Sequence, residues 1–232
     1  MVSVTNIAIG VVVLIIIILI IRYIISSRTK ISTLKNAKDV TKIDAKSLEQ
    51  SNSTNYAYSA WIYIDDWSYR YGEPKIVLGR LDDDLQPSPS ITLGAIENNL
   101  KVETTVYASK NSTEGKKHSC EVANIPIQKW VCVIVSLYGR TLDIYIDGKL
   151  VRTCVLPGVA KLNNNAPVYI TPLGGFAGFT SNIHYYNDSV NPQEAYNIYR
   201  RGYTGAFSGF SMPYSVKVEF LKDGEEKGSF SI

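Results

Sequence analysis

The chain is poor in the two residue types that build most zinc sites and disulfide frameworks. Its 232 residues include three cysteines and two histidines. Cys120, Cys132 and Cys154 form an odd set without paired spacing, so we expect reduced thiols. Neither His118 nor His184 has a neighbouring cysteine or carboxylate pattern that suits zinc. The composition argues against a disulfide-rich scaffold and against a zinc finger.

Recognisable catalytic motifs are also missing. The sequence contains no Gly-x-Ser-x-Gly elbow and no phosphate-binding loop, which are the local signatures of serine hydrolases and of P-loop nucleotide-binding proteins. We therefore expect a protein that is not an enzyme and that carries no organic cofactor.

A long apolar run stands near the start of the chain. Every residue from Ile7 to Ile21 is apolar or glycine, and apolar character resumes at residues 23–25. A helix of about 19 residues spans about 28 Å, close to the hydrocarbon thickness of a bilayer. Residues 1–6 carry no charged side chain and no small-residue cleavage site follows, so a cleaved signal peptide fits poorly. We predict a transmembrane anchor over residues 1–25, marked by Ile7, Val11, Leu14, Ile18, Ile21, Arg22 and Tyr23.

Basic residues gather directly after this run. Residues 22–46 hold seven Lys or Arg and two Asp, a net charge of +5, whereas the whole chain carries +3. Residues 26–55 are otherwise rich in Ser, Thr and Asn, so we expect a basic stalk. Lys and Arg beside a membrane span favour the cytosolic side. We expect the N-terminus to be lumenal or extracytoplasmic, the domain to face the cytosol, and no nucleic-acid partner.

From residue 56 short runs of alternating apolar and polar residues predict a β domain. Asp147-Gly148 predicts a tight hairpin. Asn191, Pro192 and Glu194 predict the start of one helix that ends at Gly202. Strands are expected over residues 58–64, 75–80, 90–96, 100–107, 130–137, 141–146, 149–155, 168–171 and 176–186, and a C-terminal hairpin extension over residues 205–232, with strands at 215–221 and 228–232.

Four segments carry a family resemblance: residues 58–64 with Trp61, 125–130 with Trp130, 142–151, and 174–186 with Gly174, Gly175 and Gly178. In this order they resemble the laminin-G-like, concanavalin A-type jelly roll. The resemblance implies a mainly β, two-sheet antiparallel sandwich over residues 56–204, with Trp61 and Trp130 as inward core anchors. The glucanase branch would need paired carboxylates, typically Glu-x-Asp-x-x-Glu, and the sequence lacks that motif.

Two acidic clusters are candidates for a calcium site. Asp65-Asp66 and Asp82-Asp83-Asp84 place hard oxygen ligands on expected loops, and related sandwiches often bind calcium or sugar at such rims. A solvated acidic loop accounts for the same residues, and we favour it. Calcium is kept as the alternative.

The anchor and the laminin-G-like domain together resemble virion proteins of large DNA viruses that infect algae and protists. The resemblance implies a minor capsid protein that lies between an inner viral membrane and the capsid, with the membrane and other virion proteins as partners. The alternative is a carbohydrate-binding adhesion module on a membrane surface. Sequons at Asn52, Asn111 and Asn187 are glycosylated only if the domain enters the secretory lumen.

Overall fold

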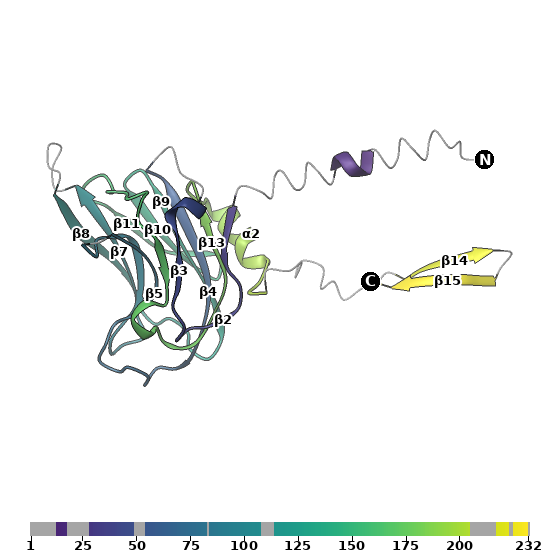
Figure 1. Cartoon of the computed structure of the whole chain (residues 1–232), viewed down its shortest axis with the longest axis horizontal. Helices are drawn as coiled ribbons and strands as arrows, with labels where there is room; N and C mark the ends of the chain where they lie inside the picture. Colours follow the sequence, from purple (N-terminus) through teal and green to yellow (C-terminus); the bar gives the residue numbers. More distant parts are fainter. Residues whose placement is uncertain are drawn as a thin grey trace.

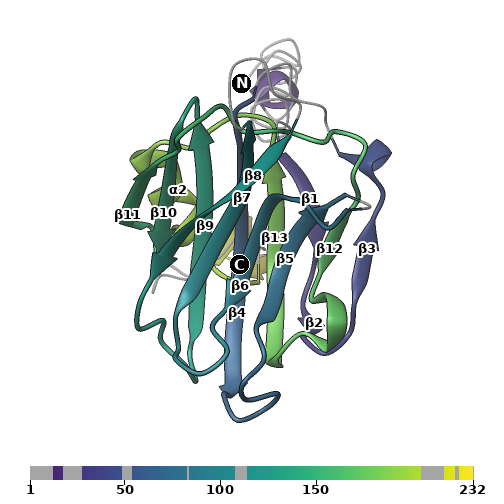
Figure 2. The same ribbon diagram turned by 90° about the vertical axis from the view of Figure 1, so that its left-hand side faces the viewer.

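Two antiparallel β-sheets pack face to face and form the domain (Figures 1 and 2). The computed structural model describes residues 13–17, 28–48, 54–82, 84–107, 114–204, 217–222 and 225–231. Within them a jelly-roll-like sandwich of two sheets is accompanied by few helices, which confirms the expected mainly β architecture. The two sheets enclose one large apolar core.

The first sheet has seven strands, in the order β1-β13-β4-β9-β10-β11, and β2 also pairs with β13. Each of the predicted strands in it is present, and β4 and β9 are longer than expected. The bounds are β1 Arg28–Ser32, β2 Lys35–Asn36, β4 Tyr56–Asp66, β9 Trp130–Tyr138, β10 Thr141–Ile146, β11 Lys149–Val155 and β13 Ala177–Tyr186.

The second sheet has six strands, in the order β3-β12-β5-β6-β7-β8. Strand β8 was not predicted, because most of its side chains are polar and exposed and Cys120 is its one buried residue. The bounds are β3 Thr41–Ile43, β5 Lys75–Leu81, β6 Pro87–Leu93, β7 Leu100–Tyr107, β8 Gly115–Val122 and β12 Val168–Ile170. Two 3-10 turns, η1 Ala45–Ser47 and η2 Pro172–Gly174, and a separate hairpin, β14 Lys217–Lys222 with β15 Glu225–Ser231, lie outside these two sheets.

The central strands β4 and β9 are buried on both faces. Tyr58, Ala60 and Ile62 of β4 point into the space between the sheets and belong to the main core. Alternate residues of the same strand, such as Ala57 and Trp61, belong to a second apolar cluster on the outer face. Because side chains alternate across a strand, a strand covered on both faces reads as a continuous apolar run, and this explains the sequence of residues 131–135.

The expectation of a stalk over residues 26–55 is wrong for residues 28–48. Strands β1 and β2 pair with β13 in one sheet, and β3 pairs with β12 in the other. Ala37 and Leu48 are buried in the main core. The scattered apolar residues of this segment were too few to show a strand pattern, yet Ile31 and Ile43 also pack against this core. The sandwich therefore begins at residue 28.

The predicted helix is present as α2, Pro192–Arg200, on the outer face of the seven-stranded sheet (Figure 1). The capping box is complete: the Asn191 side chain accepts a hydrogen bond from the Glu194 amide, and the Glu194 carboxylate accepts one from the Asn191 amide. The predicted hairpin packs against this helix. A Cβ at Gly148, where φ is +74°, would lie 2.9 Å from Cβ of Tyr199. Only glycine fits this turn, which fixes the β10–β11 hairpin beneath α2.

The expectation of three reduced thiols is also wrong. Cys120 of β8 and Cys154 of β11 form a disulfide, with their Cα atoms 6.2 Å apart. Cys132 remains free and is fully buried. The two partners are 34 residues apart in sequence, and their strands belong to different sheets. Sequence spacing could not reveal a contact that depends on how the sheets stack.

Candidate functional site

The outer face of the seven-stranded sheet carries an apolar cluster beneath α2. Trp61 of β4, Cys132 of β9 and Tyr145 of β10 meet Ala195 and Ile198 of the helix. Trp61 is thus buried, but it does not point into the space between the sheets as expected. Its register on β4 places it on the face opposite to Tyr58 and Ile62, which points toward α2.

Trp130 is partly buried and lies at the margin of the same face. Its ring stacks on Tyr203, with ring centres 4.6 Å apart and planes 4° apart. Tyr63 and Phe179 continue the row of rings, at centre distances of 5.7 Å and 6.4 Å. Phe179 is 42% exposed and Tyr203 is 40% exposed. The expectation that Trp130 is an inward core anchor is therefore wrong, and the residue belongs to an aromatic row on the surface.

A rim pocket of about 610 Å³ opens where three loops meet at one end of the sandwich. The loops are β4–β5, β6–β7 and β8–β9, and the lining residues are Trp67, Ile96, Glu97, Asn98, Asn99, Ala123, Asn124 and Ile127. The indole of Trp67, several amides and one carboxylate are the groups that this pocket presents. It can hold a polar ligand against an aromatic ring, but it has no carboxylate pair for acid–base chemistry.

Hydrogen bonds fix the walls of the rim pocket. Trp67 Nε1 donates to the Ile96 carbonyl at 2.8 Å, and Asn98 Nδ2 donates to the Ile125 carbonyl at 2.9 Å. The Asn99 side-chain oxygen accepts from the Asn124 amide at 3.3 Å. These bonds join the three loops to one another. Sequence analysis did not find this site, and its one available signal was a tryptophan directly after the acidic pair at residues 65–66.

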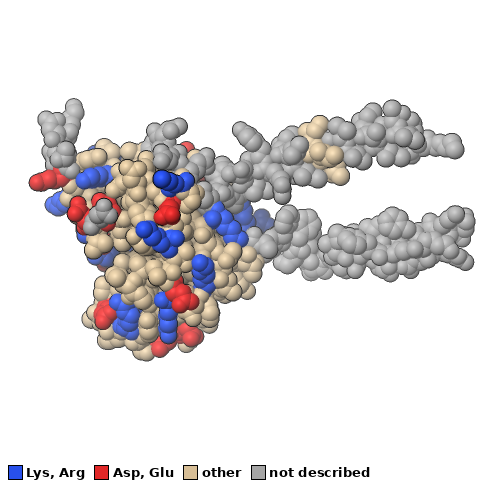
Figure 3. Space-filling view, viewed as in Figure 1, with Lys and Arg blue, Asp and Glu red and all other residues tan. Residues whose placement is uncertain are grey.

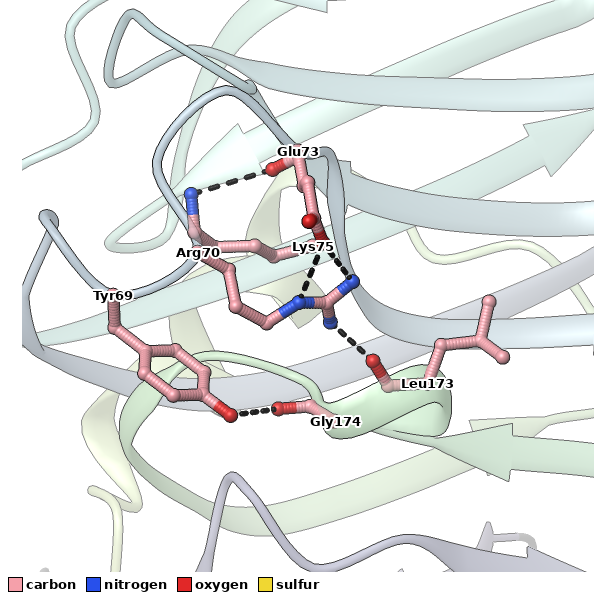
Figure 4. Close-up of polar contacts among 6 residues, drawn as sticks. All are labelled: Tyr69, Arg70, Glu73, Lys75, Leu173 and Gly174. Carbon is pink, nitrogen blue, oxygen red and sulfur yellow. Dashed lines mark hydrogen bonds and ion pairs between the residues drawn. The ribbon is translucent and has the colours of Figure 1, made fainter.

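A polar clasp holds the β4–β5 loop against η2 (Figure 4). Tyr69 donates to the Gly174 carbonyl at 3.1 Å, and Arg70 donates to the Leu173 carbonyl. The Arg70 guanidinium is paired with Glu73 at 2.6 Å. Gly174 adopts φ of +85°, a conformation that glycine accepts readily. The clasp fixes the loop that carries Trp67.

Lys75 lies behind this clasp and is almost completely buried. Its Nζ donates to the Glu73 carbonyl at 3.4 Å and lies 4.9 Å from the centre of the Trp67 ring. Burial and the nearby Arg70 lower the pKa of Lys75. The contact of a cation with an indole helps to hold Trp67 in place.

Asp65 and Asp66 are the last residues of β4 and do not lie on a loop as expected, whereas Asp82 and Asp84 lie between β5 and β6. The carboxylates of Asp66 and Asp82 are used in local turns. Asp66 accepts hydrogen bonds from the amide and the hydroxyl of Ser68, each at 2.8 Å. Asp82 accepts from the amides of Asp84 and Gln86. Asp83 lies outside the described residues. No group of three or more His, Cys, Asp or Glu in the described part of the chain has the arrangement of a metal site, and this includes Asp65.

Strand β11 forms a free edge of the seven-stranded sheet. Leu150, Val151 and Val155 are 48%, 45% and 67% exposed. Strand β11 also exposes Lys149 and Arg152, whereas the neighbouring edge strand β8 exposes Lys116 and Lys117 without large apolar side chains beside them. Charged side chains on an edge discourage pairing with another chain, whereas apolar ones permit it. Of these two edges, β11 is the one suited to a partner strand.

Most of the predicted anchor lies outside the described residues, including Ile7, Val11, Ile18, Ile21, Arg22 and Tyr23. Leu14 belongs to a short helical segment at residues 13–17. Among the described residues, no helix combines the length and apolarity that a membrane crossing requires.

Comparison with known proteins agrees with the architecture. The sequence model of the Concanavalin A-like lectin/glucanases superfamily (Laminin_G_3) matches residues 35–195. Among solved structures, the botulinum neurotoxin serotype D ligand-binding domain in complex with N-acetylneuraminic acid is similar, with a TM-score of 0.55, 14% identity, and coverage of 74% of this chain and 43% of that one.

Two further structures are similar. The receptor-binding domain of the botulinum neurotoxin C/D mosaic has a TM-score of 0.54, 11% identity and the same coverage of 74% and 43%. The binding domain of botulinum neurotoxin DC in complex with rat synaptotagmin II has a TM-score of 0.50, 14% identity, and coverage of 63% and 35%. The chain spans less than half the length of these structures, and at such identities the likeness shows the fold alone. No curated protein matches the sequence. Because the family model covers more than half of the chain, the protein belongs to the concanavalin A-like lectin/glucanase superfamily.

Proposed function

We propose that the chain is a membrane-anchored, non-enzymatic protein that links a membrane to a protein layer. The observation that carries this proposal is the position of β1. The sandwich begins at Arg28, three residues after the apolar run ends at Ile25. An extended chain covers at most about 3.5 Å per residue, so a bilayer anchor would hold the domain directly at the membrane surface.

The free edge at β11 supplies the contact for the protein layer. An extended segment of a partner can add a strand to such an edge by main-chain hydrogen bonds. Exposed Leu150 and Val151 would lie against its side chains. An anchored domain with such an edge would suit a minor capsid protein that lies between the inner membrane and the capsid of a large DNA virus.

Two independent features support the proposed location. Lys and Arg beside the anchor favour a domain on the cytosolic side during assembly. The Cys120–Cys154 disulfide needs oxidising surroundings, and a released virion is one of the settings in which disulfides persist. A domain that folds on the cytosolic side and is oxidised in the particle satisfies both.

A photoreactive amino acid at Val151 tests the proposal in isolated particles. We expect a cross-link from Val151 to another virion protein. A matched control carries the same amino acid at Ser119, which is exposed on the charged edge strand β8, and we expect no cross-link from it. Particles that lack the protein, or protease removal of the domain from intact particles, would contradict the proposal.

A second candidate function is carbohydrate binding, and the rim pocket favours it. An indole and several amides in one pocket suit a sugar ring that stacks on the aromatic face while its hydroxyls bind amides. A structure with the same fold is described with N-acetylneuraminic acid bound. A glycan array with and without calcium tests this function. Binding that Trp67→Ala abolishes and Phe179→Ala preserves would place the lectin function first.

A further inference from the structure

A second, smaller pocket lies on the first strand of the sandwich. Its volume is about 270 Å³, and it is lined by Lys30, Ile31, Ser32, Thr33 and Lys35. All five residues belong to β1, β2 or the short connection between them. We call it the β1 pocket. Two of its five residues carry an ammonium group, two carry a hydroxyl, and none carries a carboxylate.

The local backbone explains why a pocket forms here. The pairing of β1 with β13 shifts its register between Lys30 and Ser32, and such an irregularity re-aims the neighbouring side chains. Ile31 packs against the main core. Ser32 is also buried, and its hydroxyl donates to the Thr33 carbonyl at 3.1 Å. Ile31 and Ser32 thus point inward, and Lys30 and Lys35 border the pocket on either side of them in the sequence.

The two lysines are available to bind an anion. Both are exposed, and among the described residues the ion pairs join other partners. Lys35 Nζ donates to the Thr41 hydroxyl at 3.0 Å, which orients the side chain and leaves its other ammonium hydrogens for a ligand. Two ammonium groups and the exposed Thr33 hydroxyl around one small space are suited to a phosphate group.

The segment that carries the β1 pocket holds further positive side chains. Lys38, Lys42 and Lys46 follow in the same segment and are exposed, against Asp39 and Asp44. In Figure 3 blue side chains predominate over the part of the face where Figure 1 draws β1 and β3. Each lysine near an anionic membrane surface adds to its attraction.

We propose that the β1 pocket binds a phosphate group, and that in the anchored protein this group belongs to a phospholipid headgroup. The assignment of the lipid rests on the proposed membrane anchor. Lys30 lies five residues after Ile25, within about 18 Å of extended chain, so the pocket would stand at headgroup level. The edge of the sandwich at β1 then binds the bilayer surface, and this contact fixes the orientation of the domain.

Lysine acetylation followed by mass spectrometry tests this proposal on the full chain. The protein is placed in nanodiscs of phosphatidylcholine alone, in nanodiscs that also contain phosphatidylserine, and in an uncharged detergent with and without inorganic phosphate. We expect the labelling rates of Lys30 and Lys35 to be at least about threefold lower in the anionic nanodiscs than in detergent without inorganic phosphate. Phosphatidylcholine also carries a phosphate group, so protection is expected in nanodiscs of that lipid too. Lys149 on β11, also exposed, should label at one rate in every arm.

The detergent arms distinguish the source of the phosphate group. Protection by inorganic phosphate as strong as that in nanodiscs assigns a site for free phosphate, and protection in nanodiscs alone assigns a lipid headgroup site. Lys30→Gln should remove the protection of Lys35, because the two ammonium groups share one ligand. The matched variant Lys116→Gln, exposed on β8 at the opposite side of the sandwich, should leave it unchanged. The proposal is overturned if the labelling rates of Lys30 and Lys35, like that of Lys149, are the same in every arm.

Flotation after carbonate extraction separates this result from the proposed anchor. A chain that floats with the bilayer but shows no protection of Lys30 and Lys35 keeps its anchor and loses the phosphate site. If the chain does not float, the proposed membrane anchor is refuted. The detergent arms with and without inorganic phosphate then show by themselves whether the β1 pocket binds phosphate.

Discussion

Cys120 and Cys154 join the last strand of the six-stranded sheet to the last strand of the seven-stranded sheet. The opposite side of the sandwich is connected differently. There β1 and β2 lie in one sheet and β3 lies in the other, so the chain itself passes between the sheets. The two sheets are therefore tied together along both sides, by a covalent bond on one and by continuous backbone on the other.

Removal of the disulfide should destabilise the domain without changing its fold. The cross-link closes a segment of 34 residues, and loops of this length lower the entropy of the unfolded chain enough to contribute about 3–4 kcal/mol. We expect Cys154→Ser to lower the free energy of unfolding in urea by about this amount. A reducing agent should destabilise the wild type equally and have no further effect on the variant. Equal stability of the two proteins under oxidising conditions would contradict the prediction.

Cys132 should be unreactive in the folded protein. It is buried between α2 and the sheet, and its pKa is raised by burial and by the nearby Asp147. The thiolate, which is the reactive form, is therefore rare at neutral pH. We expect iodoacetamide to modify no cysteine in the native oxidised chain and one cysteine after denaturation. Cys132→Ser should remove that single modification, and rapid labelling of the native protein would show that the site is open.

Arg80 is a buried cation that binds carbonyl groups. Its Nε donates to Ala166 at 3.2 Å and its Nη2 to Asn164 at 2.9 Å, so it holds the β11–β12 connection on the six-stranded sheet. We expect Arg80→Met to lower stability by about 1–3 kcal/mol, because the two carbonyls lose their donor. Arg152→Met on the exposed edge of β11 is the matched control, with an effect below about 0.5 kcal/mol. Urea unfolding of both variants measures the difference.

The sequence predicted most strands because their apolar residues alternate or form short continuous runs. It also predicted α2, since Asn191, Pro192 and Glu194 are local signals for a helix start. The segment of residues 28–48 has no such pattern. Strands β1, β2 and β3 are five, two and three residues long, and they exist because β13 and β12 offer them edges to pair with. Tertiary pairing, rather than local propensity, determines this part of the fold.

The candidate sites, too, are formed by tertiary contacts that local sequence patterns do not reveal. Trp61 and Trp130 were identified as important aromatic residues, but the face of the strand on which each lies depends on strand register and on α2. The rim pocket brings together Trp67, Asn98 and Asn124 from three loops, and no spacing within one segment connects them. The acidic residues were visible in the sequence, yet Asp66 and Asp82 are engaged in turns.

Asp66 should titrate at lower pH than an ordinary aspartate. The hydroxyl and amide of Ser68 donate to its carboxylate and lower its pKa. A carboxyl group whose pKa is lower in the folded than in the unfolded state stabilises the fold above the unfolded pKa, and this stabilisation is lost as the pH falls through the folded pKa. We expect Ser68→Ala to raise the pKa of Asp66 toward its usual value. An NMR titration of labelled aspartates measures the change, and Ser119→Ala on β8 serves as the control that leaves it unaffected.

The smallest fragment that folds should begin near residue 28 rather than at residue 56. A fragment of residues 56–204 lacks Leu48, which is buried in the main core, and Ile31 and Ile43, which pack against it. Burial of one such side chain contributes about 1.5–3 kcal/mol, and a domain of this kind is stable by only about 5–15 kcal/mol. The shorter fragment also leaves β12 and β13 as unpaired edges, which favour aggregation. We expect residues 28–204 to unfold cooperatively in urea and residues 56–204 to be unfolded or aggregated. Equal urea midpoints for the two fragments would show that β1–β3 are dispensable.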